Sequence, residues 1–337
     1  MLLLVALWLC SVGSACFFGS VSLPAAQIIH ALLAFGDIDP LVSTIVWELR
    51  IPRVFLAAVC GGGLALAGVC LQGVLKNALA DPFTLGISQG AACGASLCLV
   101  GSSLFGSALF GGMIGIALAS FCGALFAMLG TLWLGAHGGR FDAPSVLLAG
   151  IAMATFLGAL VALVKALHED SIASIVFWIM GSFQGRSWES LPLLVLTFVP
   201  AVLTLCCVWR SLDLFALGDE HAQSIGLNVS WVRFLVLVAA SFMTAGCVAV
   251  AGVIGFVGLV VPHIVRLLLG VQNGVLLIGA FFGGGILVLW ADVVARTLIP
   301  DGQEIPVGVV TALLGGPFFA WLVWKKGRGS SGGEGSV

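Results

Sequence analysis

Uncharged stretches of about twenty residues recur along this 337-residue chain and constrain its fold more than any other feature. A bilayer core about 30 Å thick needs roughly twenty apolar helical residues for each crossing. The intervals that fit one crossing and contain no Lys, Arg, Asp or Glu are 54–75, 143–164, 190–209 and 306–324. Two longer uncharged intervals each hold two helices: 82–137, divided near 101–106, and 234–265, divided near 252–258. With the apolar intervals 1–18 and 275–294, the sequence predicts an all-α, polytopic membrane protein of about ten transmembrane helices.

The composition agrees with a chain whose main solvent is lipid. Hydrophobic residues make up 61% of the sequence and charged residues only 8%, against about a quarter charged in a soluble domain. The net charge is -2 and no segment is strongly basic, so we expect no nucleic-acid partner. None of the ten cysteines forms a C-x-x-C pair, which argues against a metal or redox site.

Positive charges outside the spans predict the orientation, because cytoplasmic loops are enriched in Lys and Arg. With both termini placed in the cytoplasm, eight Lys and Arg residues fall inside and five fall outside. The outside residues are Arg50, Arg53, Lys165, Arg186 and Arg296. We expect a multi-pass protein of the bacterial inner membrane with both termini cytoplasmic. Residues 1–327 would form one transmembrane domain, followed by a disordered cytoplasmic tail over 328–337.

No residue pattern indicates an enzyme. The phosphate-binding loop G-x-x-x-x-G-K-[ST] is absent, because none of the four lysines follows a glycine. The five histidines fall at predicted loops or helix ends, and none has a glutamate at metal-site spacing. We therefore expect no catalytic residue, no metal and no cofactor, and any ATP hydrolysis would occur in a separate subunit. An intramembrane enzyme is the weakest alternative.

An ion-coupled secondary transporter is the main alternative. Such proteins place an ionisable residue near the membrane midplane, where desolvation makes it costly. Lys165 and Asp292 are the nearest cases, but each lies at the end of its predicted span and can reach the interface. This placement counts against ion coupling and leaves it open.

Five segments carry longer motifs. They are 47–53 (WELRIPR), 71–86 (LQGVLKNALADPFTLG), 252–266 (GVIGFVGLVVPHIVR), 291–296 (ADVVAR) and 304–311 (EIPVGVVT). In this order they closely resemble the FecCD-type permeases, the membrane subunits of ATP-binding cassette (ABC) importers for iron-siderophores, haem and cobalamin. The resemblance runs from about 46 to 325.

The resemblance implies a fold, partners and a mechanism. The fold is that of the type II ABC importer permeases, and the unit is a homodimer with the translocation path between its two copies. The expected partners are two ATP-binding cassette ATPase subunits, a periplasmic or lipid-anchored substrate-binding protein, the second copy and the lipid bilayer. Transport would proceed by alternating access, in which ATP and the docked binding protein favour different states.

Two arginines flank Pro52, a residue tolerated in the first turn of a helix because its missing N–H is not needed there. Arg50 and Arg53 lie one helical turn apart, so their guanidinium groups are expected to project from one place on the outer surface. Anchoring to lipid headgroups is the general explanation for such residues. In the resembled family, arginines at these places and at Arg296 meet glutamates on the two lobes of the binding protein. We therefore predict that these three arginines dock the binding protein, since a planar guanidinium pairs bidentately with a carboxylate.

The segment 210–233 is the longest polar interruption in the second half of the chain. Asp219 and Glu220 suit the first turn of a short helix and Gly226 its end, although a plain linker would satisfy the same local rules. The resemblance implies a cytoplasmic coupling segment that seats on the ATPase. Gly218 would belong to it, and the small Ala222 and Gly226 would permit close approach.

Two further expectations concern the gate and helix packing. The resemblance places the cytoplasmic gate at Ala143 and Pro144, where relatives often carry hydroxyl residues. Glycines four residues apart on one helix face are typical of tight packing between membrane helices. Such glycines are Gly86, Gly90 and Gly94, Gly111 with Gly115, and Gly279 with Gly283.

Overall fold

All ten predicted spans are helices in the computed structural model, which describes residues 1–19, 21, 23–33, 39–105, 112–137, 140–141, 143–299 and 303–330. These helices are α1 (Leu2–Ala15), α4 (Ile51–Val74), α5 (Ile87–Phe105), α7 (Gly112–Gly135), α8 (Ala143–Leu167), α10 (Leu191–Ala216), α12 (Val229–Ala251), α13 (Val257–Leu269), α14 (Asn273–Thr297) and α15 (Val307–Ser330). In the described ranges, seven helices are long and apolar enough to cross a membrane, and α1, α13 and α15 contain shorter apolar helices. The predicted fold class is confirmed, and seven of the ten predicted spans meet the length needed to cross a membrane.

Shorter elements connect these helices. They are α2 (Ala25–Leu33), α3 (Pro40–Thr44), η1 (Ile45–Arg50), η2 (Pro82–Leu85), η3 (Glu169–Ser171), α9 (Ile172–Ile179), η4 (Trp188–Ser190), α11 (Asp219–Ser224) and the strands β1 (Ala136–His137) and β2 (Arg140–Phe141). The two strands pair antiparallel between α7 and α8 and are the part of the described chain that departs from the all-α prediction. Helix α15 continues past the predicted domain end at 327, and residues 331–337 of the predicted tail lie outside the described residues.

Pro52 lies in the first turn of α4, as expected, but the helix does not begin there. Helix α3, the π-helix η1 and α4 form one continuous helix from Pro40 to Val74. The wider π-turn explains how the proline is accommodated: the Ile51 N–H donates to the Val46 carbonyl, five residues back, immediately before the residue that has no N–H to donate.

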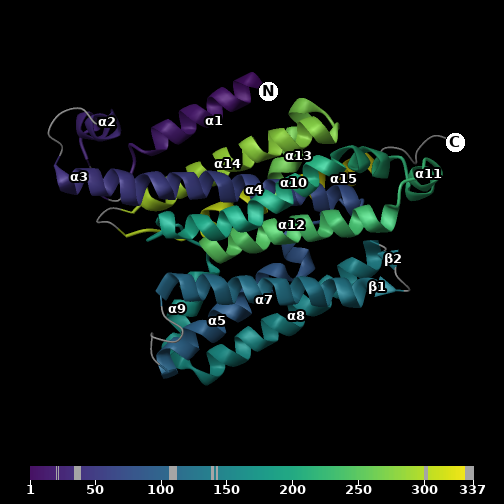
Figure 1. Cartoon of the computed structure of the whole chain (residues 1–337), viewed down its shortest axis with the longest axis horizontal. Coiled ribbons are helices and arrows are strands. Elements are labelled where there is room, and N and C mark those ends of the chain that lie inside the picture. The colour runs from purple at the N-terminus through teal and green to yellow at the C-terminus, as the bar shows by residue number, and fades with distance from the viewer. Residues whose placement is uncertain are drawn as a thin grey trace.

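Helix α4 runs through the middle of the molecule and packs closely on two neighbours (Figure 1). A Cβ at Gly61 would overlap the Gly284 carbonyl oxygen of α14, and one at Gly68 would overlap the Gly258 carbonyl oxygen of α13. Small residues at these crossings let the backbones approach, which is how helices gain packing energy in lipid. Among the seven candidate spans in the described ranges, the continuous helix Pro40–Val74 that contains α4 is the most enclosed, with 89% of its most apolar stretch buried.

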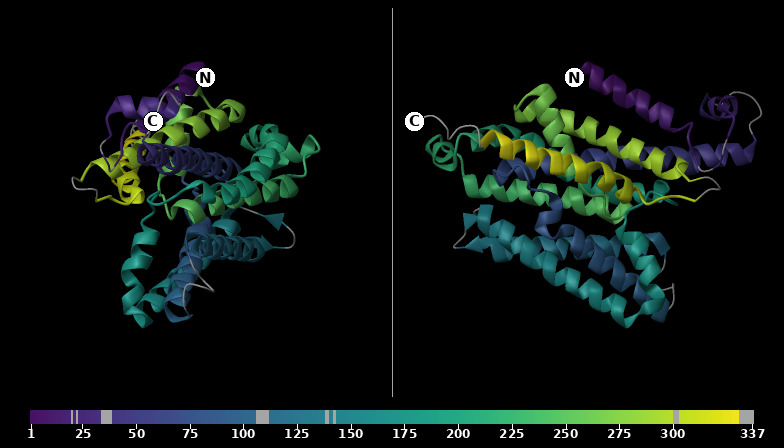
Figure 2. Two further views of the ribbon diagram at one scale, coloured as in Figure 1. Left: turned by 60° about the vertical axis from the view of Figure 1, so that its left-hand side comes forward. Right: turned by 180° about the vertical axis from the view of Figure 1, so that it is seen from behind.

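A second layer is formed by α5, α7, α8 and α9, which lie below the main layer in Figure 1 and are seen apart from it in Figure 2. The predicted glycine packing is confirmed for Gly90, which meets Gly123 of α7, and for Gly94, which meets Ala119. Gly86 was wrongly placed on that helix face: it ends η2 with φ +77°. Gly279 and Gly283 pack on valines of α13 as expected, and Gly111 lies outside the described residues.

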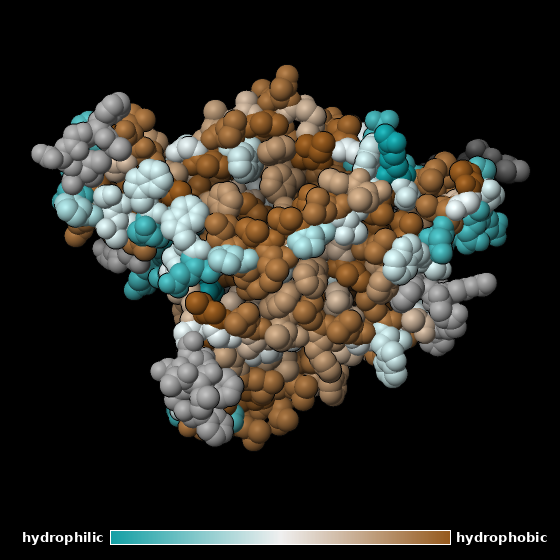
Figure 3. Space-filling view, viewed as in Figure 1, coloured by the Kyte–Doolittle hydropathy of each residue, from teal (hydrophilic) through white to brown (hydrophobic). Residues whose placement is uncertain are grey.

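The surface is apolar around its middle and polar at both ends, as Figure 3 shows for one face. We call the end with α2, α3 and α9 the arginine end, and the end with α11 and the β1–β2 pair the α11 end (Figure 1). Helix α1 runs toward the arginine end and α15 runs away from it, so both point their free termini toward the α11 end. This arrangement is the one expected for a bundle that crosses a membrane an even number of times.

The predicted break between α12 and α13 is present at residues 252–256. Gly252 has φ +72°, and a Cβ there would overlap the Trp178 carbonyl oxygen at the end of α9. The Ser182 N–H donates to the Ala251 carbonyl oxygen over 2.7 Å. Because irregular backbone inside a membrane must be enclosed by protein, the end of α9 supplies part of the cover that this break needs.

Candidate docking and coupling sites

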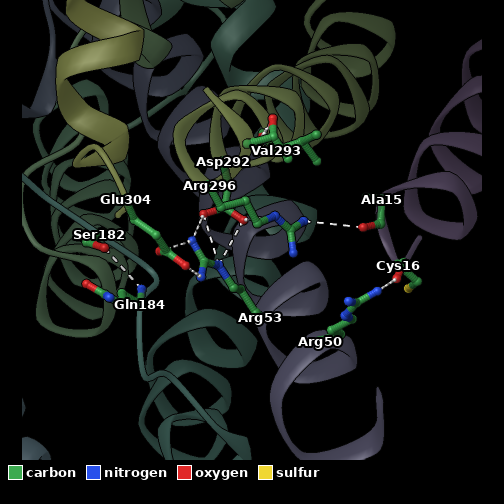
Figure 4. Close-up of polar contacts among 11 residues, drawn as sticks. Ala15, Cys16, Arg50, Arg53, Ser182, Gln184, Asp292, Val293, Arg296 and Glu304 are labelled. Atoms are coloured by element: carbon green, nitrogen blue, oxygen red, sulfur yellow. Dashed lines mark hydrogen bonds and ion pairs between the residues drawn. The ribbon is translucent and has the colours of Figure 1, made fainter. Parts of the chain in front are cut away.

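Three residues from distant motifs meet at the arginine end (Figure 4). Arg53 lies in the first turn of α4, Asp292 lies near the end of α14, and Glu304 lies in the segment before α15. A backbone hydrogen bond of 3.0 Å from the Ile305 N–H to the Ala295 carbonyl holds this segment against α14. The sequence motifs around 47–53, 291–296 and 304–311 therefore build one site.

Arg53 binds both carboxylates with its planar fork. Its Nη2 lies 2.8 Å from Asp292 Oδ1 and 2.8 Å from Glu304 Oε2, its Nη1 lies 3.0 Å from Glu304 Oε1, and its Nε lies 3.1 Å from both Asp292 oxygens. The side chains of Asp292 and Glu304 are 1% and 6% exposed. Charge-assisted bidentate pairs of this kind are strong and directional. Their geometry fixes the relative positions of α4, α14 and the start of α15.

The other two predicted docking arginines also point inward. Arg50 is 4% exposed and donates to the carbonyl oxygens of Cys16 over 3.1 Å and Val21 over 2.5 Å, beyond the end of α1. Arg296 is 3% exposed, lies 3.4 Å from Asp292 through its Nε, and donates to the Ala15 carbonyl over 3.4 Å. The expectation that these guanidinium groups project from the outer surface is wrong, because each has polar partners inside the chain. Docking itself stays a prediction.

A cavity of about 270 Å³ opens among these side chains. Its charged lining consists of Arg50, Arg53, Arg186, Arg296 and Glu304. We call it the arginine basin. In the sequence, Arg186 stood out only as a positive charge on the unexpected side of the membrane. That charge count was the one sequence signal that pointed to Arg186 as a site residue.

At the α11 end, a single carboxylate joins two cations. Asp219 Oδ1 lies 2.8 Å from Lys76 Nζ, and Asp219 Oδ2 lies 2.9 Å from Arg233 Nη2. Burial alone would raise the pKa of Asp219, but hydrogen bonds from Lys76 and Arg233 hold it below its ordinary value. Lys76 follows α4 with φ +48°, a left-handed conformation that is uncommon outside glycine. The site thus ties α11 to the ends of α4 and α12.

The predicted coupling segment contains the short helix α11, but its residues divide differently from the expectation. Gly218 and Gly226 adopt φ +109° and +91° at its two ends, and open space surrounds both. Ala222 is fully buried and packs into the chain's own core, so its predicted contact with a partner is corrected to an internal one. Glu220 is exposed, as expected of a residue that meets a partner.

Two exposed apolar side chains flank α11 and were missed from the sequence. Leu217 is 63% exposed and Ile225 is 60% exposed. Exposed apolar side chains that lie together at an aqueous end are typical of a surface that contacts a partner protein. The predicted gate residues lie at the same end: Ala143 is half-buried and Pro144 is exposed in the first turn of α8.

Two more motif residues connect α4 to α13. Gln72 is 4% exposed, donates from Nε2 to the Gly258 carbonyl over 2.9 Å, and accepts from Arg266 Nη1 over 2.7 Å. Asp81 follows α4, is 3% exposed and accepts from the Phe83 N–H over 3.2 Å. Burial raises the pKa of Asp81 to about 7, although the Phe83 hydrogen bond opposes this. In the described ranges, no three His, Cys, Asp or Glu side chains are placed to hold a metal ion.

All five motifs thus meet in space, in pairs that hold α4 to α13, α14 and α15. Residues 2–325 match the FecCD transport family. The chain belongs to this family. The hemin transport system permease HmuU of Yersinia pestis is 38% identical over 291 residues, which cover 85% of each chain. The vitamin B12 import permease BtuC of Vibrio cholerae is 39% identical over 88% of this chain and 87% of its own length.

Two further comparisons show the spread within the family. The molybdate import permease MolB of Haemophilus influenzae is 35% identical over 92% of this chain and 90% of its own length. A solved chain described as a metal-chelate type ABC transporter in an inward-facing conformation superimposes with a TM-score of 0.82 at 30% identity, covering 96% of this chain and 97% of that one. This FecCD-family chain is a multi-pass membrane protein and the permease of an ABC importer.

Proposed function

We propose that this permease carries an iron complex, haem or a cobalamin-type substrate across the bacterial inner membrane, with both termini in the cytoplasm. It would work as a homodimer with two ATPase subunits and a periplasmic or lipid-anchored substrate-binding protein. The relatives named for hemin and vitamin B12 support this substrate class. The chain would form no covalent bond with its substrate and would act through alternating access.

The observation that carries the proposal is the pairing of two different polar sites at opposite ends of one apolar bundle. The arginine basin offers buried guanidinium groups in excess over carboxylates, which suits an acidic docking partner. The α11 end offers a short helix with exposed Glu220 and flanking exposed Leu217 and Ile225. A partner that binds there through apolar and charged contacts could move α11 relative to the bundle.

A secondary transporter receives no support from the site. Asp292, the nearest candidate for an intramembrane proton carrier, is 1% exposed and already bound to Arg53. A residue that must gain and lose a proton during transport cannot keep a bidentate guanidinium partner throughout. The ion-coupled alternative is therefore not proposed.

Uptake into proteoliposomes tests the substrate class. The permease, purified with the ATPase and binding protein encoded beside it, is offered haem, a ferric siderophore, cobalamin and molybdate in turn, with and without ATP. We expect ATP-dependent uptake of one of the first three. Uptake that continues without ATP would refute the importer mechanism, and uptake of molybdate alone would refute the substrate class while keeping the mechanism.

Docking is tested separately by conservative changes, because charge reversal at buried arginines would unfold the chain. Arg50→Lys and Arg296→Lys keep the charge and remove the planar fork. We expect each to weaken binding-protein affinity about tenfold and to change its salt dependence. Lys165→Gln, a change at another outward cation, serves as the control. Equal affinities of all three variants and the wild type for the binding protein would show that these arginines only stabilise the permease itself.

A further inference from the structure

Arg186 is the member of the arginine basin that neither docking nor ion pairing uses. It follows α9 in a turn that is held in place: Gly181 and Gly185 have φ +72° and +68°, and Phe183 is fully buried. The Arg186 N–H donates to the Phe183 carbonyl over 3.2 Å. The turn therefore places Arg186 in the lining of the cavity.

The charges around the basin do not balance among the described residues. Arg53 and Arg296 lie beside Asp292 and Glu304, so these four groups are neutral as a set. Within the described ranges, Arg50 bonds only to neutral carbonyl groups, and the Arg186 guanidinium group makes no hydrogen bond or ion pair. Burial lowers the pKa of Arg186, the direction expected for a cation without a nearby carboxylate. Two positive charges are left in excess.

Hydrogen-bond donors are also in excess. Among the described residues, the Nε–H groups of Arg50 and Arg186 are buried without an acceptor, and the buried Nε–H of Arg296 makes no hydrogen bond, although it lies 3.4 Å from Asp292 Oδ2. Leaving a buried donor unpaired is costly, more so when it is charged. Three such donors from three separate elements line one cavity, which is unusual for a surface that has only a structural role.

We propose that the arginine basin binds a small inorganic oxyanion of the sulfate or phosphate type, held by Arg50, Arg186 and Arg296. Several acceptor oxygens on one ion can serve donors that arrive from three directions, which a halide cannot do as well. The cavity of about 270 Å³ is far larger than the roughly 10–15 Å³ that one water molecule needs on the same measure, so an oxyanion fits with part of its hydration shell. If the proposed docking function holds, an incoming carboxylate would displace this ion.

Thermal unfolding of the purified permease in neutral detergent tests the site without any partner. Inorganic sulfate is added across the millimolar range while sodium chloride keeps the ionic strength constant. We expect a saturable rise in the unfolding temperature of the wild type. Arg186→Gln should raise the sulfate concentration at half-maximal effect about tenfold or more, since it removes one charged donor. Arg186→Lys should lie between the two.

Lys165→Gln is the matched control, because it removes an outward cation that does not line the basin. It should titrate like the wild type. Sulfate also stabilises proteins by exclusion from their surface, but that effect rises without saturating and would be common to all variants. A non-saturating rise, or equal titrations for Arg186→Gln and Lys165→Gln, would overturn the proposal.

Isothermal titration with inorganic phosphate provides a second measurement that does not depend on unfolding. Heat of binding in the wild type and its loss in Arg186→Gln are expected, and no saturable heat in the wild type would overturn the proposal. Because docking and uptake are assayed separately, failure of anion binding with intact uptake would reject this inference alone. Saturable anion binding without ATP-dependent uptake would reject the proposed function alone.

Discussion

The ion pairs at the two ends of the bundle have opposite arrangements of charge and different exposure to solvent. At the arginine end, one guanidinium group serves two carboxylates that are nearly sealed from solvent. At the α11 end, one carboxylate with 37% of its side chain exposed serves two cations. Buried ion pairs cannot be broken cheaply, whereas half-exposed ones can exchange for water or for a partner's groups. We therefore expect the arginine end to keep its structure and the α11 end to rearrange more easily.

Removing Arg53 should reduce the unfolding free energy more than any other change proposed here. A smaller reduction would contradict the difference drawn between the two ends. Arg53→Gln leaves Glu304 buried without a counter-charge and Asp292 with only its longer contact to Arg296, so we expect a loss of about 3–5 kcal/mol in unfolding free energy. Denaturation of the purified protein in detergent measures it. The double variant with Glu304→Gln should recover much of the loss, because Asp292 still pairs with Arg296 and no buried carboxylate is then left without a cation. A single variant as stable as the wild type would show that the ion pairs do not hold this end.

Stability at the α11 end should depend on pH through Asp81, which follows α4. The folded-state pKa of Asp81 is raised to about 7, above the ordinary value of 3.8, so its contribution to stability is complete below that value and is lost as the pH rises toward 7. Two pH units at about 1.4 kcal/mol each predict a loss of about 2–3 kcal/mol between pH 5 and 7.

Asp81→Asn keeps the capping oxygen and removes the titration. Between pH 5 and pH 8 the unfolding midpoint of the wild type should fall. The midpoint of this variant should change much less over the same range. Parallel curves for the two proteins would mean that Asp81 is already ionised at pH 5.

Removing the Asp219 carboxylate should cost much less stability than removing Arg53. Asp219→Asn is expected to lower the unfolding free energy by about 1 kcal/mol, because the pairs are partly exposed. The pKa of Asp219 is lowered, so its contribution is present above its ordinary pKa and is lost only in more acidic solution. ATP-driven uptake in the assembled importer should nevertheless fall severalfold. Glu220→Gln, at an exposed position, should leave stability unchanged, and a loss of stability at Asp219 as large as at Arg53 would remove the difference between the ends.

Lys76 should give the smallest effect and measures strain at the α11 end. Its left-handed backbone costs about 1 kcal/mol or more for a residue with a Cβ, while its exposed ion pair contributes about 0–1 kcal/mol. Lys76→Gly removes both terms, so its stability should stay within about 1 kcal/mol of the wild type. Lys76→Ala loses the ion pair and keeps the strain, so it should be the less stable of the two. If the alanine variant is as stable as the glycine variant, the left-handed residue stores no strain.

The elements of the fold followed from hydropathy, since lipid leaves few alternatives to helices of a set length. Helix α9 was missed because a helix of eight residues is too short to give a span signal. The sequence did not show whether the Ala222 side chain packs in the core or faces a partner, because a small apolar residue suits both positions equally well. The ion pairs of Arg53 join residues about 240 positions apart, and local patterns contain no information on such contacts. The prediction that Arg50 and Arg296 lie on the surface was wrong for the same reason, because they donate to distant carbonyl groups near the end of α1.

One helix connects the two ends directly. Helix α4 has Arg53 in its first turn and Lys76 just beyond its last, and its 24 residues span about 36 Å. An unbroken α-helix transmits rotation and axial displacement with little bending over this length. Any change in the tilt of α4 caused at Arg53 therefore shifts the anchor of α11 by a distance proportional to the helix length. Helix α4 thus couples the position of one polar site mechanically to that of the other.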